Sequence, residues 1–174
     1  MKKTLLALLI ILLPALVFAE FQIGPAIQYK IPLSAASKIP GKHTVSINDF
    51  SFGADARLNI KWFQICGYGL LEPGDSTFSL PTSLKIYVDG GILLKLAFLR
   101  LAAGIGPDFI VNFDSTTTPS QLNGNVRFAG DIVLGRTSVS LVYLIECNLT
   151  KVGVLQAFEN VHGQLGLSVL FKIF

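Results

Sequence analysis

Residues 50 to 62 read FSFGADARLNIKW and alternate without a break between two kinds of side chain. The even positions are all apolar: Phe50, Phe52, Ala54, Ala56, Leu58, Ile60 and Trp62. The odd positions are small, polar or charged: Ser51, Gly53, Asp55, Arg57, Asn59 and Lys61. Successive side chains of a β-strand point to opposite faces, so this period of two predicts a strand, and one longer than the usual length of about five or six residues.

The same alternation recurs in seven more segments: 21–31, 63–72, 84–96, 99–113, 122–134, 139–149 and 165–173. Near residues 62, 98 and 136 the phase of the pattern reverses within two or three residues, as it does at a tight hairpin turn. The other connections, at 32–44, 73–83, 114–121 and 150–161, are longer and rich in Pro, Ser, Thr, Gly and Asn. This spacing predicts eight antiparallel strands in an up-and-down meander, with short turns at one end and long loops at the other.

The placement of charge indicates which face of the sheet lies outside. The apolar phase of the eight segments contains no Lys, Arg, Asp, Glu, Asn or Gln, whereas the opposite phase carries the charges and many of the Gly and Ala residues. A soluble sandwich or a lipocalin-like barrel would place the charged phase in water and would have to bury the large aromatic side chains. The interior of an eight-stranded barrel has little room for them. We therefore predict an all-β fold, a transmembrane eight-stranded antiparallel up-and-down β-barrel, because only a closed barrel satisfies all backbone hydrogen bonds of strands in lipid.

The composition agrees with a protein that is exported and meets lipid. Residues 1–19 begin with Lys2 and Lys3, continue as an apolar run and end in small residues, which is typical of a cleaved signal peptide. A membrane anchor is the alternative, but the run is shorter than the ~20 residues that a spanning helix needs. We expect the barrel domain to comprise residues 20–174. Hydrophobic residues make up 51% of the sequence and charged residues 14%. Without Lys2 and Lys3, 12 basic and 11 acidic side chains remain, and this balance gives no argument for nucleic acid.

After the signal segment, the whole chain resembles the small eight-stranded outer-membrane barrels of the OmpA, OmpX and OmpW type. The resemblance rests on the signal segment, the meander and the terminal aromatic residue Phe174. It implies a location in the bacterial outer membrane, contact with outer-membrane lipid, and recognition by the barrel assembly machinery through Phe174 as a C-terminal assembly signal. Phe174 is one step out of phase with Phe171 and Ile173, which departs from the pattern of the family. We expect a monomer.

The charged phase, if it faces inward, predicts a network of ion pairs across the lumen, since buried charges are tolerated when they are paired. We expect cross-strand pairs such as Asp55 or Asp89 with Arg57, Lys95 or Arg100. The predicted network comprises Lys30, Asp55, Arg57, Lys61, Lys85, Asp89, Lys95, Arg100, Asp108, Arg127, Asp131 and Glu146. Aromatic residues near the strand ends are typical of the girdles at the two membrane interfaces. The predicted interfacial aromatics are Phe50, Phe52, Trp62, Phe63, Phe109, Phe113 and Phe171.

These features favour an integral membrane protein with a structural or interaction role and a charged, largely filled interior. A narrow channel or transporter for small solutes, including apolar ones, is the alternative, whereas a wide porin would need an open lumen. A third reading is a lipid-modifying enzyme, because the resemblance class includes enzymes with a His and a Ser or acid at the outer rim. His43 and His162 fall near the long loops, with Ser46, Asp49 and Ser168 in the vicinity by rough register. No spacing here is specific, so we expect no enzyme, no cofactor and no metal.

Overall fold

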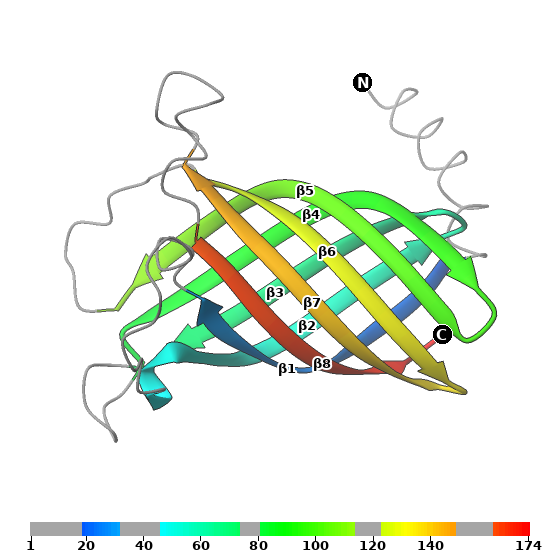
Figure 1. The fold of residues 1–174 in the computed structure, drawn as a ribbon, viewed down its shortest axis with the longest axis horizontal. Coiled ribbons are helices and arrows are strands. Elements are labelled where there is room, and N and C mark those ends of the chain that lie inside the picture. The colour runs from blue at the N-terminus through cyan, green and yellow to red at the C-terminus, as the bar shows by residue number, and fades with distance from the viewer. Residues whose placement is uncertain (1–18, 32–45, 74–80, 114–122, 149–161) are drawn as a thin grey trace, which may run out of the picture.

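The computed structural model describes residues 19–31, 46–73, 81–113, 123–148 and 162–174. The proposed signal peptide, apart from Ala19, and most of the four long connections lie outside the described residues. Eight strands form one closed barrel (Figure 1): β1 (Ala19–Ile31), β2 (Phe50–Ile60), β3 (Phe63–Glu72), β4 (Ser83–Leu96), β5 (Leu99–Asn112), β6 (Asn123–Leu134), β7 (Thr137–Asn148) and β8 (His162–Lys172). A short 3-10 helix, η2 (Ile47–Asp49), precedes β2. The predicted fold class and strand number are confirmed.

Every strand pairs antiparallel with its neighbours in the sequence, and β1 also pairs with β8, which closes the barrel. The strands wind obliquely around the barrel axis, and the three short turns lie at one end (Figure 1). We call this the turn end, and the opposite end the loop end. Among the described residues, no helix is long and apolar enough to cross a membrane.

The three turns each contain two residues, and in each the first residue has a positive φ. These angles are 52° at Lys61, 45° at Ala97 and 67° at Gly135. The carbonyl of the second turn residue accepts a hydrogen bond from the next even-numbered strand: Trp62 from Leu93, Phe98 from Val133, and Arg136 from Lys172, each at 2.7 Å. The hairpin unit therefore repeats in its backbone contacts as well as in its sequence. The prediction that β2 continues to Trp62 is wrong, because Lys61 and Trp62 form the turn.

Glycines allow neighbouring strands to approach closely at several points in the barrel wall. A Cβ atom on Gly24 would lie 1.8 Å from the carbonyl oxygen of Val169, and one on Gly91 would lie 1.9 Å from that of Ala103. Glycine inside a strand often marks a site where another backbone approaches closely. Small residues on the polar phase therefore permit this close approach, in addition to leaving room in the lumen.

Candidate functional site: the barrel interior

The interior is built from the polar phase of the strands, and most of its side chains are polar. The inward-facing polar residues that are almost fully buried are Gln22, Gln28, Ser51, Asp55, Arg57, Asn59, Gln64, Ser83, Asp89, Asp108, Asn125, Arg127, Asp131, Ser138, Ser140, Gln164 and Ser168. Tyrosine and aliphatic side chains of the same phase fill the remaining space, notably Tyr68, Leu70, Tyr87, Leu93, Val142, Leu144 and Leu170. Together these side chains occupy the space inside the barrel wall.

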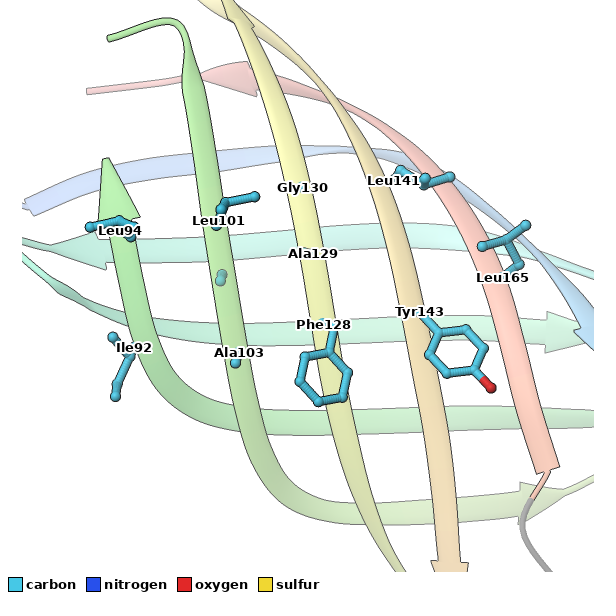
Figure 2. Close-up of a pocket in the computed structure, with 11 residues that line it drawn as sticks. Ile92, Leu94, Leu101, Ala103, Phe128, Ala129, Gly130, Leu141, Tyr143 and Leu165 are labelled. Carbon is cyan, nitrogen blue, oxygen red and sulfur yellow. The ribbon is translucent and has the colours of Figure 1, made fainter. Parts of the chain in front are cut away.

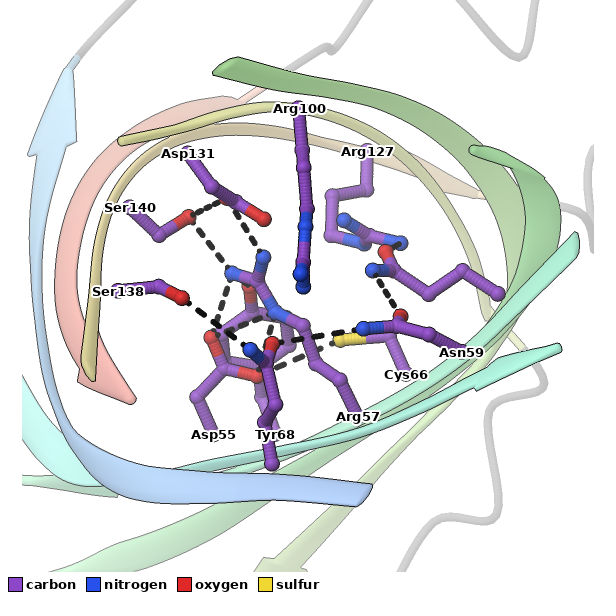
Figure 3. A network of polar contacts seen from close by, with 12 residues as sticks. Asp55, Arg57, Asn59, Cys66, Tyr68, Arg100, Arg127, Asp131, Ser138 and Ser140 are labelled. Carbon is purple, nitrogen blue, oxygen red and sulfur yellow. Dashed lines mark hydrogen bonds and ion pairs between the residues drawn. The ribbon is translucent and has the colours of Figure 1, made fainter. Parts of the chain in front are cut away.

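Arg57 on β2 is the centre of the polar network (Figure 3). Its Nη2 donates to Asp55 Oδ2 at 2.7 Å, and its Nη1 donates to Asp131 Oδ1 at 2.8 Å. Nη2 also lies within hydrogen-bond distance of Tyr68 Oη, at 3.0 Å, and Ser140 Oγ, at 2.8 Å. Ser140 in turn donates to Asp131 Oδ1 at 2.6 Å. One guanidinium thus connects β2, β3, β6 and β7 across the lumen.

Arg127 on β6 forms the second arginine cluster at mid-height. It binds Asp89 in a two-pronged pair, from Nε to Oδ2 and from Nη2 to Oδ1, both at 2.8 Å. Nη2 also donates to Gln64 Oε1 at 2.7 Å. Gly104 leaves room for this pair, because a Cβ there would lie 2.2 Å from Asp89 Oδ1.

Amide side chains extend the network from mid-height to the turn end. Gln64 Nε2 donates to Asn59 Oδ1 at 2.7 Å, Asn59 Nδ2 to Gln22 Oε1 at 3.4 Å, and Gln22 Nε2 to Glu20 Oε1 at 2.9 Å. Glu20 then accepts from Arg100 Nη1 at 2.6 Å, and Lys172 Nζ lies 3.6 Å from its other oxygen. Polar contacts therefore run continuously from the arginine clusters to the turn end.

A separate group of ion pairs lies toward the loop end. Glu72 Oε1 lies 2.6 Å from Lys30 Nζ and 3.1 Å from Lys85 Nζ. Lys85 also pairs with Glu146 Oε1 at 3.1 Å, and the same oxygen accepts hydrogen bonds from Tyr87 and Gln164. Lys30 is the outermost residue of this group of ion pairs, and 38% of its side chain is accessible to solvent. This end of the lumen is more open than the middle.

Burial shows that the lumen is closed at mid-height. Asp55, Arg57 and Arg127 are 0% exposed and Tyr68 is 1% exposed, although all four are polar and point inward. A continuous water-filled path past this level would leave some of their surface accessible. The network therefore fills the cross-section of the barrel at the level of the two arginines.

Most of the charged residues singled out in the sequence lie in the lumen, but they differ in environment. Asp55, Arg57, Asp89, Arg127 and Asp131 form the two buried clusters. Lys30, Lys85, Arg100 and Glu146 lie nearer the ends, and Asp108 is buried near the loop end. The prediction that Lys95 belongs to the network is wrong, because Lys95 is exposed at the turn end and forms no ion pair with another described residue. The prediction that Lys61 belongs to the internal network is wrong, because its backbone forms the first turn and its side chain is exposed.

The partners of these charges could not all be anticipated. The pair of Asp55 with Arg57 agrees with one expected combination, whereas Asp89 pairs with Arg127 and Arg100 pairs with Glu20. Members that the sequence reading did not single out are Glu20, Gln22, Gln64, Tyr68, Tyr87, Ser138, Ser140 and Gln164. The sequence signal that could have identified them is their position on the polar phase of the alternation, which faces the lumen.

The outer face of the barrel is apolar and includes the predicted aromatic residues. Trp62, Phe63 and Phe171 lie at the turn end, and Phe50, Phe52, Phe109 and Phe113 lie toward the loop end. A hollow of about 610 Å³ lies in this face over β4 to β8. Figure 2 shows the side chains that line it. It forms where the small residues Ala103 and Gly130 lie between larger neighbours such as Phe128 and Tyr143. Lipid contact at these residues stays a prediction.

A β-bulge places Phe174 despite its irregular phase. Ile173 donates its backbone N–H to Phe21 O at 2.9 Å, and Phe21 donates to Phe174 O at 3.1 Å, so two residues oppose one. The extra residue brings the Phe174 ring into a stack with the ring of Phe21, with centroids 5.7 Å apart. The departure from the family pattern therefore has a local structural cause. The role of Phe174 as an assembly signal stays a prediction.

The residues considered for catalysis do not form a described nucleophile–base pair. Ser46 and Asp49 cap η2: Asn48 N donates to Ser46 Oγ at 3.3 Å, and Ser46 N donates to Asp49 Oδ2 at 2.8 Å. Ser168 is buried against the β1–β8 seam, opposite Ala26, so its expected place at the rim is wrong. His43 lies outside the described residues. Among the described residues, no group of three His, Cys, Asp or Glu side chains could hold a metal ion.

Comparison with solved structures gives the same architecture. Outer membrane protein H (OprH) from P. aeruginosa superimposes with a TM-score of 0.59 at 12% identity, covering 88% of this chain and 99% of that one. The fold is that of a small outer-membrane barrel. Neisserial surface protein A (NspA) superimposes with a TM-score of 0.53 at 13% identity, covering 89% of this chain and 97% of that one. No family model and no curated protein matches the sequence.

Proposed function

We propose that this chain is an integral protein of the bacterial outer membrane with a structural or interaction role, and that its lumen does not pass solutes. The observation that carries this proposal is the closed level at Arg57 and Arg127, where ion-paired side chains exclude solvent. A barrel that is filled in this way gains rigidity from its interior and offers its ends and outer face for contact.

The outer face supports the membrane location. Twenty-six large hydrophobic side chains are exposed among the described residues, and many of them lie on the outward phase of the strands. A soluble protein rarely exposes so large a contiguous apolar surface. In lipid the same surface is favourable, and the closed sheet leaves no strand edge unpaired. The solved barrels with this fold are outer membrane protein H and Neisserial surface protein A.

The long connections at the loop end are the natural contact sites for partners outside the cell, because barrels of this kind have short periplasmic turns and longer extracellular loops. We further propose that the chain is monomeric, is surrounded by outer-membrane lipid, and reaches the membrane through the barrel assembly machinery with Phe174 as part of its signal. We propose no enzymatic activity, because Ser168 lies inside the barrel wall and Ser46 and Asp49 bind each other at η2.

A narrow channel is the second candidate, and the two ends of the lumen favour it. The side chains of Lys30 at one end and Lys172 at the other are 38% and 40% exposed, so solvent reaches charged side chains at both ends of the barrel. Passage would then require the arginine clusters to rearrange.

Planar-bilayer recording separates the two candidates. The purified barrel should insert, as judged by heat-modifiable migration in SDS gels, and should show no discrete conductance steps. The double variant Arg57→Ala and Arg127→Ala should show steps if it folds, because it removes the two side chains that fill the middle of the lumen. Frequent steps from the unaltered protein would contradict the closed-lumen proposal and support the channel.

A further inference from the structure

Five basic side chains gather at the turn end of the barrel. Lys61 and Arg136 lie in two of the turns, Lys95 precedes the turn at Ala97 and Phe98, Arg100 follows it, and Lys172 ends β8. We call these five residues the basic rim. Lys61, Lys95 and Arg136 are exposed, and the Lys172 side chain is 40% exposed.

The basic rim is poorly compensated by negative charge. Glu20 is already 2.6 Å from Arg100 and 3.6 Å from Lys172, and Asp131, which lies opposite Arg100 on β6, is already paired with Arg57. Lys61, Lys95 and Arg136 form no ion pair with another described residue. These three unpaired side chains leave the rim with a net positive charge.

The loop end has the opposite balance among the described residues. Lys30 and Lys85 are its basic side chains, against Asp49, Glu72, Asp108 and Glu146. The positive excess is therefore a local property of the turn end. The whole chain is nearly neutral once Lys2 and Lys3 are set aside.

Exposed aromatic rings lie directly beside these charges. Trp62 follows Lys61 in the first turn and is 68% exposed, and Phe98 in the second turn is 67% exposed. Phe63 and Phe171 continue the aromatic surface on the adjoining strands. Aromatic rings near the ends of membrane-spanning segments are typical of residues at the level of lipid headgroups, and long basic side chains reach toward the same level.

We propose that the basic rim binds the headgroups of anionic phospholipids in the periplasmic leaflet. This inference rests on the proposed membrane location. It further specifies which class of lipid is bound and which end of the barrel binds it. Exposed lysine and arginine side chains attract an anionic membrane surface within about a Debye length, roughly 10 Å at 0.1 M salt. A zwitterionic headgroup carries no net charge and gains much less from the same side chains.

Trp62 provides a built-in probe, because it is the single tryptophan of the sequence and lies within the rim. The barrel is refolded into phosphatidylcholine vesicles that contain phosphatidylglycerol, with bromine atoms on the acyl chains of one lipid or the other. Bromine quenches tryptophan fluorescence at contact, so the two quenching curves give the relative affinity of the Trp62 site for each lipid. We expect anionic lipid to be favoured about two- to fivefold, and the preference to fall as salt is raised toward about 1 M.

A charge-matched pair of variants isolates the rim. The first variant combines Lys61→Gln, Lys95→Gln and Arg136→Gln. Its ratio of affinities for anionic over zwitterionic lipid at the Trp62 site should fall close to one, while Trp62 is still quenched. Lys38→Gln, Lys42→Gln and Lys151→Gln remove the same charge from segments that join strands at the loop end, and should leave the preference unchanged. Both variants are first checked for folding by heat-modifiable migration.

Each outcome has a distinct meaning. Strong quenching of the unaltered protein by both lipids to the same extent would overturn the rim proposal and leave the membrane barrel intact. A preference that survives in the rim variant, or that disappears in the loop-end variant, would also overturn it. A folded barrel whose Trp62 is quenched by neither lipid would contradict the membrane location itself.

Discussion

Arg57 and Arg100 both face the lumen and both pair with carboxylates, but at different depths. Arg57 at mid-height is fully buried and holds two carboxylates, Asp55 and Asp131. Arg100 at the turn end is 12% exposed and shares Glu20 with Lys172. Removal of one member of a buried pair leaves an uncompensated charge, whereas a pair near water can be replaced by solvation. The same chemistry should therefore stabilise the middle of the barrel and contribute little at its end.

Replacement of the central arginine should have the largest effect. Arg57→Met should lower the free energy of unfolding by about 3 to 5 kcal/mol, because it leaves Asp55 and Asp131 buried without their counterion. Urea titration of the refolded barrel in lipid vesicles measures this change. Asp55→Asn and Asp131→Asn in the same background should restore part of the stability; if they restore none, unpaired charge is not the cause.

A substitution at the position next to Arg57 tests whether an arginine is tolerated on the outward face of the barrel at the same height. Ala56→Arg places the same side chain at a similar height on the outward face of β2, where it should cost about 2 to 4 kcal/mol in a membrane. Ala56→Leu is the matched control and should fold like the unaltered protein. Equal insertion of both variants into vesicles would contradict a lipid-facing position for Ala56.

The space beside the second arginine cluster can be closed by one methyl group. Gly104→Ala places a Cβ 2.2 Å from Asp89 Oδ1, so the pair with Arg127 has to shift, at a cost of about 1 to 3 kcal/mol. Gly69→Ala is the control, because a Cβ at Gly69 meets nothing within 4 Å. If both variants unfold at the same urea concentration, the Asp89–Arg127 pair can shift without loss of stability.

The smallest effect is expected at the turn end. Arg100→Met should lower the free energy of unfolding by no more than about 1 kcal/mol, because Glu20 keeps Lys172 as a partner and gains water. The same urea titration reports this change. A loss as large as that of Arg57→Met would remove the proposed difference between the two depths.

The sequence pattern contained most of the information on the fold. Strict alternation and the reversal of its phase located the strands and turns, because the pleat of a strand imposes that period. It could not place Lys61 and Trp62, since a two-residue turn can continue an alternation by chance. The phase mismatch of Phe174 was visible in the sequence, but the bulge that explains it depends on the backbone contacts with Phe21.

The interior was predictable by residue type and less by pairing. The polar phase identified Arg57 and Arg127 as inward-facing, but their partners depend on how far each strand is displaced along its neighbour. Arg57 and Asp131 are 74 positions apart and meet across the lumen, so no local pattern links them. Glu20 was not singled out because it precedes the first alternating segment, which begins at Phe21. Leucines such as Leu144 fill gaps that only the packed barrel defines.

The seam between β1 and β8 bears on how the protein folds. In this seam Gln22 pairs with Lys172. The contacts that close the barrel therefore join residues near the two ends of the described chain. Ordering nearly the whole chain before this pairing forms is slow, and until then both edge strands expose unpaired backbone groups. Closure of the seam is therefore the step at which an incomplete barrel is most exposed to mispairing with other chains.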